Sequence, residues 1–435
     1  MKNSGEIGIG LLGLGNVGAG VVKLLGDNAT AIESRLGAKV VIRKIAVRSL
    51  DKPRLVAVDP SLVTSDVDAL TKDPAIDIVV ELIGGEEHAR RYTLAAIDKQ
   101  KQVVTANKLL LSKHGDEIFG LAEKSDVDVY FEAAVCAGVP VIRALREGLA
   151  SDRILELYGI VNGTSNFILT LMTQEGRSFQ DALSAAQKAG YAEANPALDI
   201  QGEDAAHKLA ILMLVCFDTR ISLKNIYVEG IGHLSPVDFA YAERLGYVIK
   251  PLVIGKVHPE GLEARVHPAM ILKNQMLASV SGVNNAVSVV SEALGQSMYY
   301  GRGAGMMPTA VAVVSDIIEV SRNILARQAQ AGAKRRAHPM TARPFRDMGM
   351  LKSHYYLRFG VLDRPGVLAQ LAGALGEHGI SIAQMMQEGK PDSNRPTIVV
   401  VTTHTAMEKH VQAALSQIDK LESVVDKTCL VRIVE

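Results

Sequence analysis

A short apolar run that leads directly into three closely spaced glycines constrains the fold of this chain more than any other feature. Residues 7–12 (IGIGLL) have the composition of a buried parallel strand. The turn Gly13-Leu14-Gly15-Asn16-Val17-Gly18 follows, and AGVVKLLGDN after it is typical of a helix. In this strand–turn–helix context, G-x-G-x-x-G indicates a dinucleotide site in which a helix N-terminus faces a pyrophosphate. A βα turn without a ligand is the alternative.

Four further apolar stretches predict a doubly wound parallel sheet. They are residues 40–47, 77–82, 102–107 and 128–133, with helix-like segments between them. Such alternation is typical of an α/β domain whose ligand lies beyond the carboxyl ends of the strands. We expect a Rossmann-type domain over residues 1–140, completed by a long helix from about 308–330.

Residues at the ends of these strands are candidates for the cofactor site. Val47 and Arg48 close the second strand, where NAD-specific folds usually place an acid for the ribose diol. Arg48 can instead pair with a 2′-phosphate, which favours NADP. Asp51 keeps NAD open, and Arg48 could equally be an ordinary surface arginine. Thr105 and Lys108 close the fourth strand, where a lysine can face the nicotinamide and the reacting carbonyl.

A turn of small residues follows Glu132 at the end of the fifth strand. Residues 133–140 (AAVCAGVP) expose backbone carbonyls that, with Glu132, could bind a monovalent cation. A plain turn before a helix is the alternative. Cys136 in this turn is also a candidate nucleophile, but no His lies within a few residues to activate it.

The strongest candidate for chemistry is an acid-rich segment with one lysine, residues 186–208. It contains the Gly190-Tyr191 turn, Glu193, Asp199, Asp204 and Lys208. Carboxylates beside a lysine suit a site that binds a substrate ammonium and donates a proton to a developing alkoxide.

From Gly202 onward, the sequence GEDAAHKLAILMLVCF predicts a helix, so Asp204 and Lys208 lie one turn apart on one face. The same face continues through Ile211 and Val215, and we expect it to be buried. A structural i,i+4 ion pair near a helix N-terminus is the alternative.

The middle of the chain predicts an α+β domain for substrate binding and oligomerisation over residues 141–307. The polar turn 162–166 (NGTSN) precedes a helix, with Ser165 or Asn166 as the expected N-cap. Strands at 153–161, 247–257 and 262–267 and a helix at 237–245 follow from their patterns. The glycine-rich turn 301–305, just before Pro308, is expected to cover the cofactor.

The C-terminal part predicts a separate module. Residues 331–352 are basic and contain Pro and Gly, as a linker does. Residues 353–435 predict the order βαββαβ, a ferredoxin-like unit without a cluster of acid, base and nucleophile, so we expect a regulatory role.

Composition excludes several classes of function. Among 435 residues, 47 Lys and Arg balance 47 Asp and Glu, so nothing points to nucleic acid or an anionic membrane surface. No apolar run approaches the roughly 20 residues of a membrane span. The three cysteines, Cys136, Cys216 and Cys429, are widely spaced, so we expect neither a disulfide framework nor a zinc site, and a cytoplasmic location.

Together these motifs resemble the homoserine dehydrogenase family. The segment from Ala186 to Lys208 is similar to the family signature, and GLGNVG, TANK, VNGTSN and GRGAGMMPT extend the resemblance over nearly all of residues 1–330. The tail, with Asp363-Arg364-Pro365-Gly366 after its first strand, resembles an ACT domain, an amino-acid-sensing module. No aspartate kinase precedes the dehydrogenase part, so the chain resembles the monofunctional form.

The resemblance implies NAD(P)H-dependent, reversible reduction of L-aspartate 4-semialdehyde to L-homoserine, on the route to threonine, isoleucine and methionine. It implies that Lys208 is the proton donor and that Lys108 lies beside the substrate and the nicotinamide. Glu193 and Asp204 hold the substrate, and Asp199 supports the site. Two alternatives stay open: a phosphorylating semialdehyde dehydrogenase that uses Cys136, and a non-catalytic amino-acid sensor.

The resemblance also implies ligand sites. The cofactor residues are Gly13, Gly15, Asn16, Val17, Gly18, Val47, Arg48, Thr105, Lys108, Gly190 and Gly305. A sodium ion is bound by Glu132 with the backbone of Val135, Ala137 and Val139, where Cys136 and Ala137 partly replace the family's usual glycines. Asp363, Pro365 and Gly366 belong to the site of an amino-acid effector, expected to be threonine, and the assembly is a homodimer or homotetramer.

Overall fold

The computed structural model describes residues 5–329, 343–388 and 396–434, which form two compact units. The described part of the first unit comprises residues 5–157, 207–225 and 284–329, and that of the second comprises 158–206, 226–283, 343–388 and 396–434. Two elements, β7 (Ile154–Ile160) and α10 (Glu203–Phe217), run from one unit into the other.

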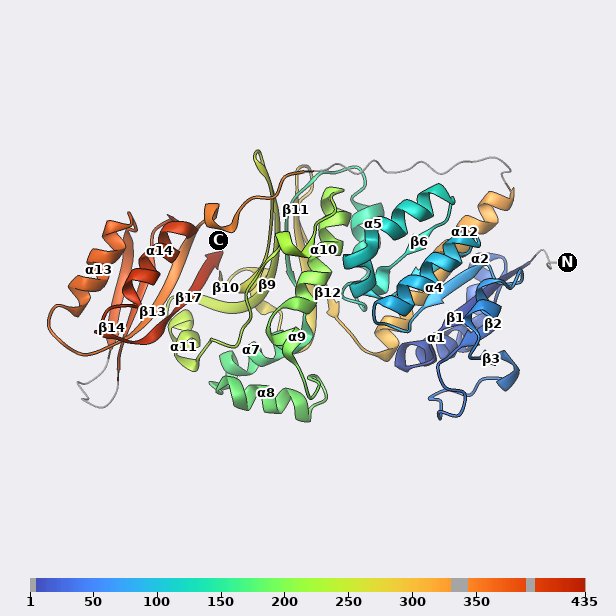
Figure 1. The fold of residues 1–435 in the computed structure, drawn as a ribbon, viewed down its shortest axis with the longest axis horizontal. Coiled ribbons are helices and arrows are strands. Elements are labelled where there is room, and N and C mark those ends of the chain that lie inside the picture. The colour runs from blue at the N-terminus through green and yellow to red at the C-terminus, as the bar shows by residue number, and fades with distance from the viewer. Residues whose placement is uncertain (1–4, 330–342, 389–395, 435) are drawn as a thin grey trace. The chain divides into compact units, whose positions relative to one another are not determined.

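The first unit contains a six-stranded parallel sheet in the order β3-β2-β1-β4-β5-β6 (Figure 1). The chain reverses its direction of travel across the sheet beside β1, which is where doubly wound folds bind nucleotides. The strands are β1 (Glu6–Leu12), β2 (Lys39–Ala46), β3 (Val63–Thr64), β4 (Ile78–Glu81), β5 (Gln102–Thr105) and β6 (Val129–Tyr130). The helices are α1 (Asn16–Asp27), α2 (Ala29–Leu36), α3 (Val67–Thr71), α4 (Glu87–Asp98), α5 (Lys108–Lys124), α6 (Val141–Arg143) and α12 (Met306–Ala329).

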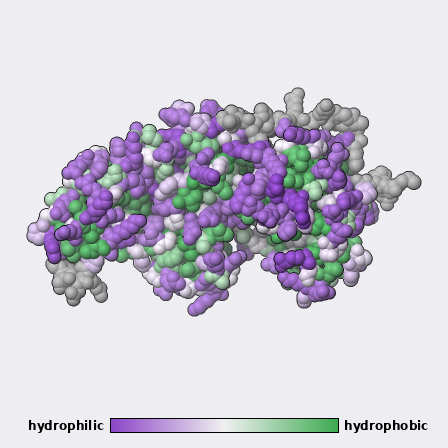
Figure 2. Space-filling view, in the orientation of Figure 1, coloured by the Kyte–Doolittle hydropathy of each residue, from purple (hydrophilic) through white to green (hydrophobic). Residues whose placement is uncertain are grey.

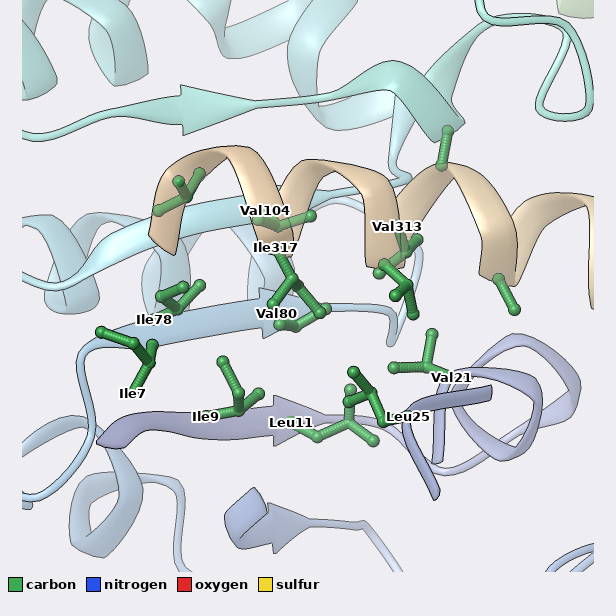
Figure 3. Close-up of a cluster of buried hydrophobic side chains, with 14 of the residues drawn as sticks. Ile7, Ile9, Leu11, Val21, Leu25, Ile78, Val80, Val104, Val313 and Ile317 are labelled. Carbon is green, nitrogen blue, oxygen red and sulfur yellow. The ribbon is translucent and has the colours of Figure 1, made fainter. Parts of the chain in front are cut away.

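Helix α12 returns from far along the chain to cover one face of this sheet. Figure 3 shows Val313 and Ile317 of α12 close to Val80 of β4 and Val104 of β5, in a buried cluster that also includes Ile9 and Leu11 of β1. Each fully buried aliphatic side chain of this size contributes about 1.5–3 kcal/mol. Pro308 lies in the first turn of α12, as predicted, where a missing amide hydrogen has no cost.

The second unit is built on a mixed sheet in the order β7-β9-β10-β17-β13-β15-β14. Its strands are β8 (Tyr227–Val228), β9 (Tyr247–His258), β10 (Gly261–Leu272), β13 (Lys352–Val361), β14 (Ile382–Glu388), β15 (Thr397–Thr403), β16 (Ala406–Met407) and β17 (Val424–Val434). Its helices are α7 (Gly163–Glu175), α8 (Phe179–Lys188), α9 (Ala197–Ile200), α11 (Pro236–Arg244), α13 (Val367–Glu377) and α14 (Glu408–Ile418).

The C-terminal module, residues 352–388 and 396–434, has the predicted ferredoxin-like order, with β13 between β17 and β15 and with β14 at the edge. One face of its strands packs on α13 and α14. The other face supplies Tyr356, Val400 and Val431 to a core shared with α7, α8 and α11. Strand β17 also pairs in parallel with β10, so the module is joined to the rest of the second unit by both a core and a sheet.

The predicted fold class is confirmed, and two details differ. The N-cap of α7 is Asn162, whose Oδ1 accepts from the Ser165 amide at 2.8 Å, so the expected caps Ser165 and Asn166 are wrong. Residues 284–302, for which no strand was predicted, form the hairpin β11 (Asn284–Ser291) and β12 (Gly295–Arg302). The period-2 alternation of Val287, Ser288 and Val289 is its sequence signal.

Two expectations from the sequence concern the linker and a membrane-spanning helix. Of the predicted linker, residues 331–342 lie outside the described residues, and 343–352 contain a short 3-10 turn at Met348–Met350. No helix within the described ranges has the length and hydropathy that a membrane crossing requires. On the face drawn in Figure 2, hydrophilic residues predominate and hydrophobic residues appear in small separate areas.

Candidate functional site

The glycine turn after β1 has the shape of a phosphate cradle. Gly13 has a φ of +101°, which favours glycine, and its amide donates to the Ala46 carbonyl at 2.9 Å. A Cβ at Gly18 would lie 2.3 Å from the Gly13 carbonyl oxygen, so only glycine lets α1 pack this closely on the turn. A Cβ at Gly15 would meet nothing within 4 Å. The N-terminus of α1, which has no side-chain cap, is therefore open to a ligand phosphate.

The other cofactor candidates around this turn lie at the same edge of the sheet. Strand β2 pairs with β1 as far as Ala46, next to Leu12, so Val47 and Arg48 follow β2 at the level of the glycine turn. Val47 is buried, whereas Arg48, Asn16 and Gly15 are exposed. This edge therefore carries an exposed arginine beside the open helix N-terminus.

The ends of β4 and β5 are fastened together by a buried carboxyl group that the sequence analysis did not single out. Glu81 Oε2 accepts from Thr105 Oγ1 at 2.6 Å, and Oε1 accepts from the amides of Ile83 and Gly84 at 2.9 and 3.1 Å. Burial raises the pKa of Glu81, while these hydrogen bonds oppose the rise. The sequence signal that could have identified Glu81 is its position at the carboxyl end of a central strand.

Lys108 is held at the start of α5 by the residue before it. Asn107 Oδ1 caps α5 by accepting from the Leu110 amide at 3.1 Å, and Asn107 Nδ2 donates to the Gly85 carbonyl at 2.8 Å. Lys108 is therefore the first residue of a helix that starts at the carboxyl end of β5. A cation at this end of a helix interacts unfavourably with the helix dipole.

Lys208 lies on α10, a helix that contacts α5. Ser112 Oγ and His207 Nδ1 are 2.7 Å apart, which brings the second turn of α5 against the residue preceding Lys208. Both Lys108 and Lys208 are half-buried. Farther along α10, Ile211 is buried and Val215 only half-buried, so the predicted burial of this face holds in part.

One amide group holds two of the three predicted carboxylates together. Asn162 Nδ2 donates to Asp199 Oδ1 at 2.7 Å and to Asp204 Oδ2 at 2.8 Å. Asn162 is 6% exposed, and the two acids are half-buried. Ser165 Oγ also donates to the Asp199 carbonyl at 2.9 Å. Asn162 was missed as a site residue, although an Asn three residues before a Ser at a helix start is a cap signal.

Glu193 belongs to the exposed part of the segment. Glu193, Gly190 and Tyr191 are all exposed, and Gly190 has a φ of +74°. Two contacts join the segment to α7. Thr164 Oγ1 donates to the Tyr191 carbonyl at 2.7 Å, and the Tyr191 ring packs edge-on against the Phe167 ring with their centroids 4.9 Å apart. The structure therefore brings Asp199 and Asp204 together through Asn162, whereas Glu193 lies in the exposed part of the segment.

The turn after Glu132 is buried and shaped by a carboxylate. Glu132 Oε1 and Oε2 accept from the amides of Ile142 and Arg143 at 2.9 and 2.8 Å, and the Glu132 amide donates to Asp316 at 2.8 Å. Burial raises the pKa of Glu132 and raises that of Asp316 to about 7. No group of three His, Cys, Asp or Glu side chains suited to a metal occurs among the described residues. A cation here would depend on backbone carbonyls.

Cys136 is a structural residue of this turn. It has a φ of +48°, in the region that favours glycine. The side chain is 1% exposed, and its Sγ accepts from Asn285 Nδ2 at 3.4 Å. A thiol in this position has no access to substrate, so a nucleophilic Cys136 has no support.

Two predicted glycine turns lie in the remaining parts of the chain. Gly301 and Arg302 end strand β12, so only Gly303 to Gly305 form a turn, in which Gly305 has a φ of +130°. In the C-terminal module, Asp363, Pro365 and Gly366 are exposed between β13 and α13, and Gly366 has a φ of +91° at the N-cap of α13.

Comparison with known proteins agrees with this architecture. Residues 13–132 match the NAD-binding domain of homoserine dehydrogenase, residues 140–318 match the homoserine dehydrogenase model, and residues 355–423 match the ACT domain. The homoserine dehydrogenase of Neisseria gonorrhoeae is 43% identical over 428 residues, 98% of each chain. That of Synechocystis is 43% identical over 434 residues, covering 98% of this chain and 99% of the relative.

A crystal structure of a homoserine dehydrogenase from Thiobacillus denitrificans is similar throughout. It superposes with a TM-score of 0.92 at 44% identity and covers 99% of this chain and 98% of that one. The matches span the nucleotide-binding turn, the acid-rich segment and the C-terminal module in one order. The chain therefore belongs to the homoserine dehydrogenase family.

Proposed function

We propose that Lys208 is the proton donor and acceptor of the homoserine dehydrogenase reaction, with Asp199 and Asp204 as the carboxylates that recognise the substrate ammonium. The observation that carries this proposal is the Asn162 amide, which holds both acids within 2.8 Å of one nitrogen. Two carboxylates held this close concentrate negative charge, which attracts a cation. The ammonium of aspartate semialdehyde or homoserine is such a cation.

The chain's own groups account for the acid–base part of the reaction. The bound nicotinamide cofactor supplies the hydride that reaches the aldehyde carbon. The Lys208 ammonium stabilises the negative charge that develops on the oxygen and donates the proton. In the direction of homoserine oxidation, neutral Lys208 accepts the hydroxyl proton. Lys108 would lie beside the carbonyl and the nicotinamide, and Glu193 would hold the substrate together with the paired Asp199 and Asp204.

The cofactor site is proposed to include the predicted residues of the first unit with Gly190 and Gly305, and to prefer NADP. The exposed Arg48 beside the glycine turn can pair with a 2′-phosphate. Replacement of Arg48 by Ala should raise the KM for NADP at least about tenfold and leave the KM for NAD unchanged. An equal effect on both cofactors would contradict the 2′-phosphate contact.

A sodium site at the Glu132 turn fits the donors that are present. The side chain of Glu132 is engaged with two backbone amides, so the turn it supports would offer the carbonyls of Val135, Ala137 and Val139. The left-handed Cys136 keeps the backbone in a conformation that a glycine would adopt. A rise in melting temperature in NaCl relative to choline chloride tests the site without any activity measurement.

The C-terminal module is proposed to make the enzyme respond to an amino acid, threonine being the expected effector, at Asp363, Pro365 and Gly366. This places the reaction in the supply of homoserine for threonine, isoleucine and methionine. We also propose a homodimer or homotetramer. Homoserine oxidation assayed with NADP and with NAD, each with and without threonine, tests cofactor preference and regulation together.

The assignment of the proton donor is tested by Lys208→Ala. We expect turnover in homoserine oxidation to fall at least about a hundredfold, because the alkoxide loses its proton donor. The KM for NADP should stay within twofold, because the glycine turn is unchanged. Lys113→Ala removes an exposed lysine of α5 that pairs with Glu86 and serves as the control with normal turnover. Turnover above one tenth of the parent value in Lys208→Ala would rule out this role.

A further inference from the structure

A fully buried arginine of the C-terminal module binds a carboxylate outside that module. Arg432 of β17 is 0% exposed and donates from Nε and Nη2 to Glu408 of α14 at 3.0 and 2.6 Å. Its remaining nitrogen, Nη1, donates to Glu229 Oε2 at 2.7 Å. Tyr227 OH donates to the same oxygen at 2.7 Å, and the guanidinium lies 5.0 Å from the Tyr227 ring centre. A buried charge with such partners holds their positions firmly, because losing one partner is costly.

The backbone that follows Glu229 is pressed against helix α9. A Cβ at Gly230 would lie 2.5 Å from the Ile200 carbonyl oxygen and 2.9 Å from Gln201 Cα. The next amide, that of Ile231, donates to the same Ile200 carbonyl at 3.0 Å. Contacts this close leave no room for the two segments to move independently. Residues 229–231 therefore pack directly on the last residue of α9.

Helix α9 carries one of the two paired acids. Asp199 precedes Ile200 directly, and its carboxylate shares the Asn162 amide with Asp204. A continuous series of contacts thus leads from Arg432 through Glu229 and Ile200 to Asp199, and every member belongs to the second unit.

We propose that Glu229 is a positioning residue for the substrate-binding carboxylates, and that Arg432 makes this positioning depend on the C-terminal module. The inference rests on the proposed roles of Asp199 and Asp204. When β17 moves relative to α14, the position of the Glu229 loop changes. Helix α9 then shifts with the loop, and the affinity for the substrate ammonium changes. The cofactor turn lies in the other unit and is not part of this series of contacts.

A pair of glycine substitutions tests the backbone step. Gly230→Ala introduces a methyl group that overlaps the Ile200 carbonyl, so α9 must shift. We expect the KM for homoserine to rise about tenfold or more while the KM for NADP stays within twofold. Gly232→Ala is the matched control, because its Cβ would meet only Ile200 Cγ2 at 3.7 Å, an ordinary contact. Equal homoserine KM values in the two variants would overturn the proposal.

A second pair of variants tests the charged step. Glu229→Gln removes the charge that binds Arg432 and should raise the KM for homoserine about fivefold or more, with Glu229→Asp recovering part of the loss. The control is Asp238→Asn. It breaks a different buried ion pair between the module and α11, in which Asp238 of α11 lies 2.6 Å from Arg358 of β13. It should lower the melting temperature without changing the homoserine KM. If both variants changed KM in proportion to lost stability, Glu229 would be merely structural.

Arg432→Lys, alone and combined with Glu229→Gln, completes a double-mutant cycle. Lysine keeps the charge but cannot span two carboxylates, so we expect the same rise in KM as in Glu229→Gln, with no further rise in the double variant. Additive effects would contradict a shared path. Asp204→Asn is measured alongside. If it leaves the homoserine KM unchanged, the proposed substrate site itself fails; if it raises KM while Gly230→Ala and Glu229→Gln do not, only the positioning role fails.

Discussion

Lys250 shows how one buried residue sets a pH dependence. It is 5% exposed on β9, and its ammonium donates to the Val280 carbonyl at 2.5 Å. Burial lowers the pKa of Lys250 to about 8, from 10.5. Between these two values the unfolded chain binds more protons than the folded chain, so stability rises as pH rises through this window. Below pH 8 the folded state carries a constant cost of at most about 3 kcal/mol.

Replacing Lys250 by Met should therefore stabilise the protein at neutral pH. Methionine fills similar space without charge, and the Val280 carbonyl still accepts from Asn166 Nδ2 at 3.4 Å. We expect the free energy of unfolding at pH 7 to rise by about 1–3 kcal/mol. Urea denaturation at pH 7, 8, 9 and 10 should give a flatter profile than that of the parent. A variant with an unchanged slope between pH 8 and pH 10 would show that Lys250 is not the titrating group.

At the scale of single elements, α7 depends on an asparagine with two separate functions. Asn162 caps the helix with its oxygen and joins Asp199 to Asp204 with its nitrogen. Asn162→Asp keeps the oxygen and loses the nitrogen, whereas Asn162→Ala loses both. We expect the Ala variant to lose about 1–2 kcal/mol of stability from the missing cap and more from the hydrogen bonds that Asp199 and Asp204 lose.

The two Asn162 variants should differ in stability and agree in catalysis. The Asp variant keeps the cap but loses two hydrogen bonds and adds like-charge repulsion; the repulsive part of its stability loss should shrink as the pH falls toward the acid range. Both variants should raise the KM for homoserine at least about tenfold. Thermal melts at pH 5 and pH 8, together with homoserine titrations, distinguish the two variants. Normal KM values for homoserine in both variants would exclude a role in substrate binding for the hydrogen bonds from Asn162 to Asp199 and Asp204.

Two glycines of the β1–α1 turn should differ in what a larger side chain changes, namely cofactor binding at Gly15 and stability at Gly18. Gly15→Val points into open space, so we expect an unchanged melting temperature and a KM for NADP raised at least about tenfold, because the phosphate approach is blocked. Gly18→Val drives its side chain into the Gly13 carbonyl and should yield unstable protein. Tryptophan is absent from the chain, so melts followed by circular dichroism serve as the readout. Normal NADP binding in folded Gly15→Val would contradict the cradle.

At the scale of the whole molecule, the C-terminal module is integrated rather than appended. Its strands share a core with α7, α8 and α11, and β17 extends the sheet from β10. Its removal would leave Glu229 and Asp238 without Arg432 and Arg358.

Truncation after Met350 should destabilise the enzyme rather than merely free it from regulation. The exposed apolar face around Ile249 and Met270 and the unpaired edge of β10 favour aggregation. We expect soluble yield to fall severely and any recovered protein to melt at least about 10 °C lower. Size-exclusion chromatography and thermal melts are the measurements. A monodisperse, fully active truncated enzyme would contradict this description.

Local signals by themselves determined much of this protein. Residues 7–18 predicted a strand, a glycine turn and a helix, because buried parallel strands are continuously apolar and phosphate turns need glycine at fixed spacing. The acid-rich segment, the helix carrying Asp204 and Lys208, and the βαββαβ order of the tail likewise follow from short-range patterns. All of these depend on neighbours within a few turns of chain.

Only the tertiary structure decided which distant groups meet. Asn162 joins Asp199 to Asp204, Glu81 fastens β4 to β5, Cys136 takes a left-handed turn, and Arg432 reaches Glu229 across about two hundred residues. The cap of α7 was misplaced for the same reason, because Asn162, Ser165 and Asn166 are all good caps and the entry from β7 selects among them. Pairings of this kind depend on packing and desolvation, which a linear pattern does not encode.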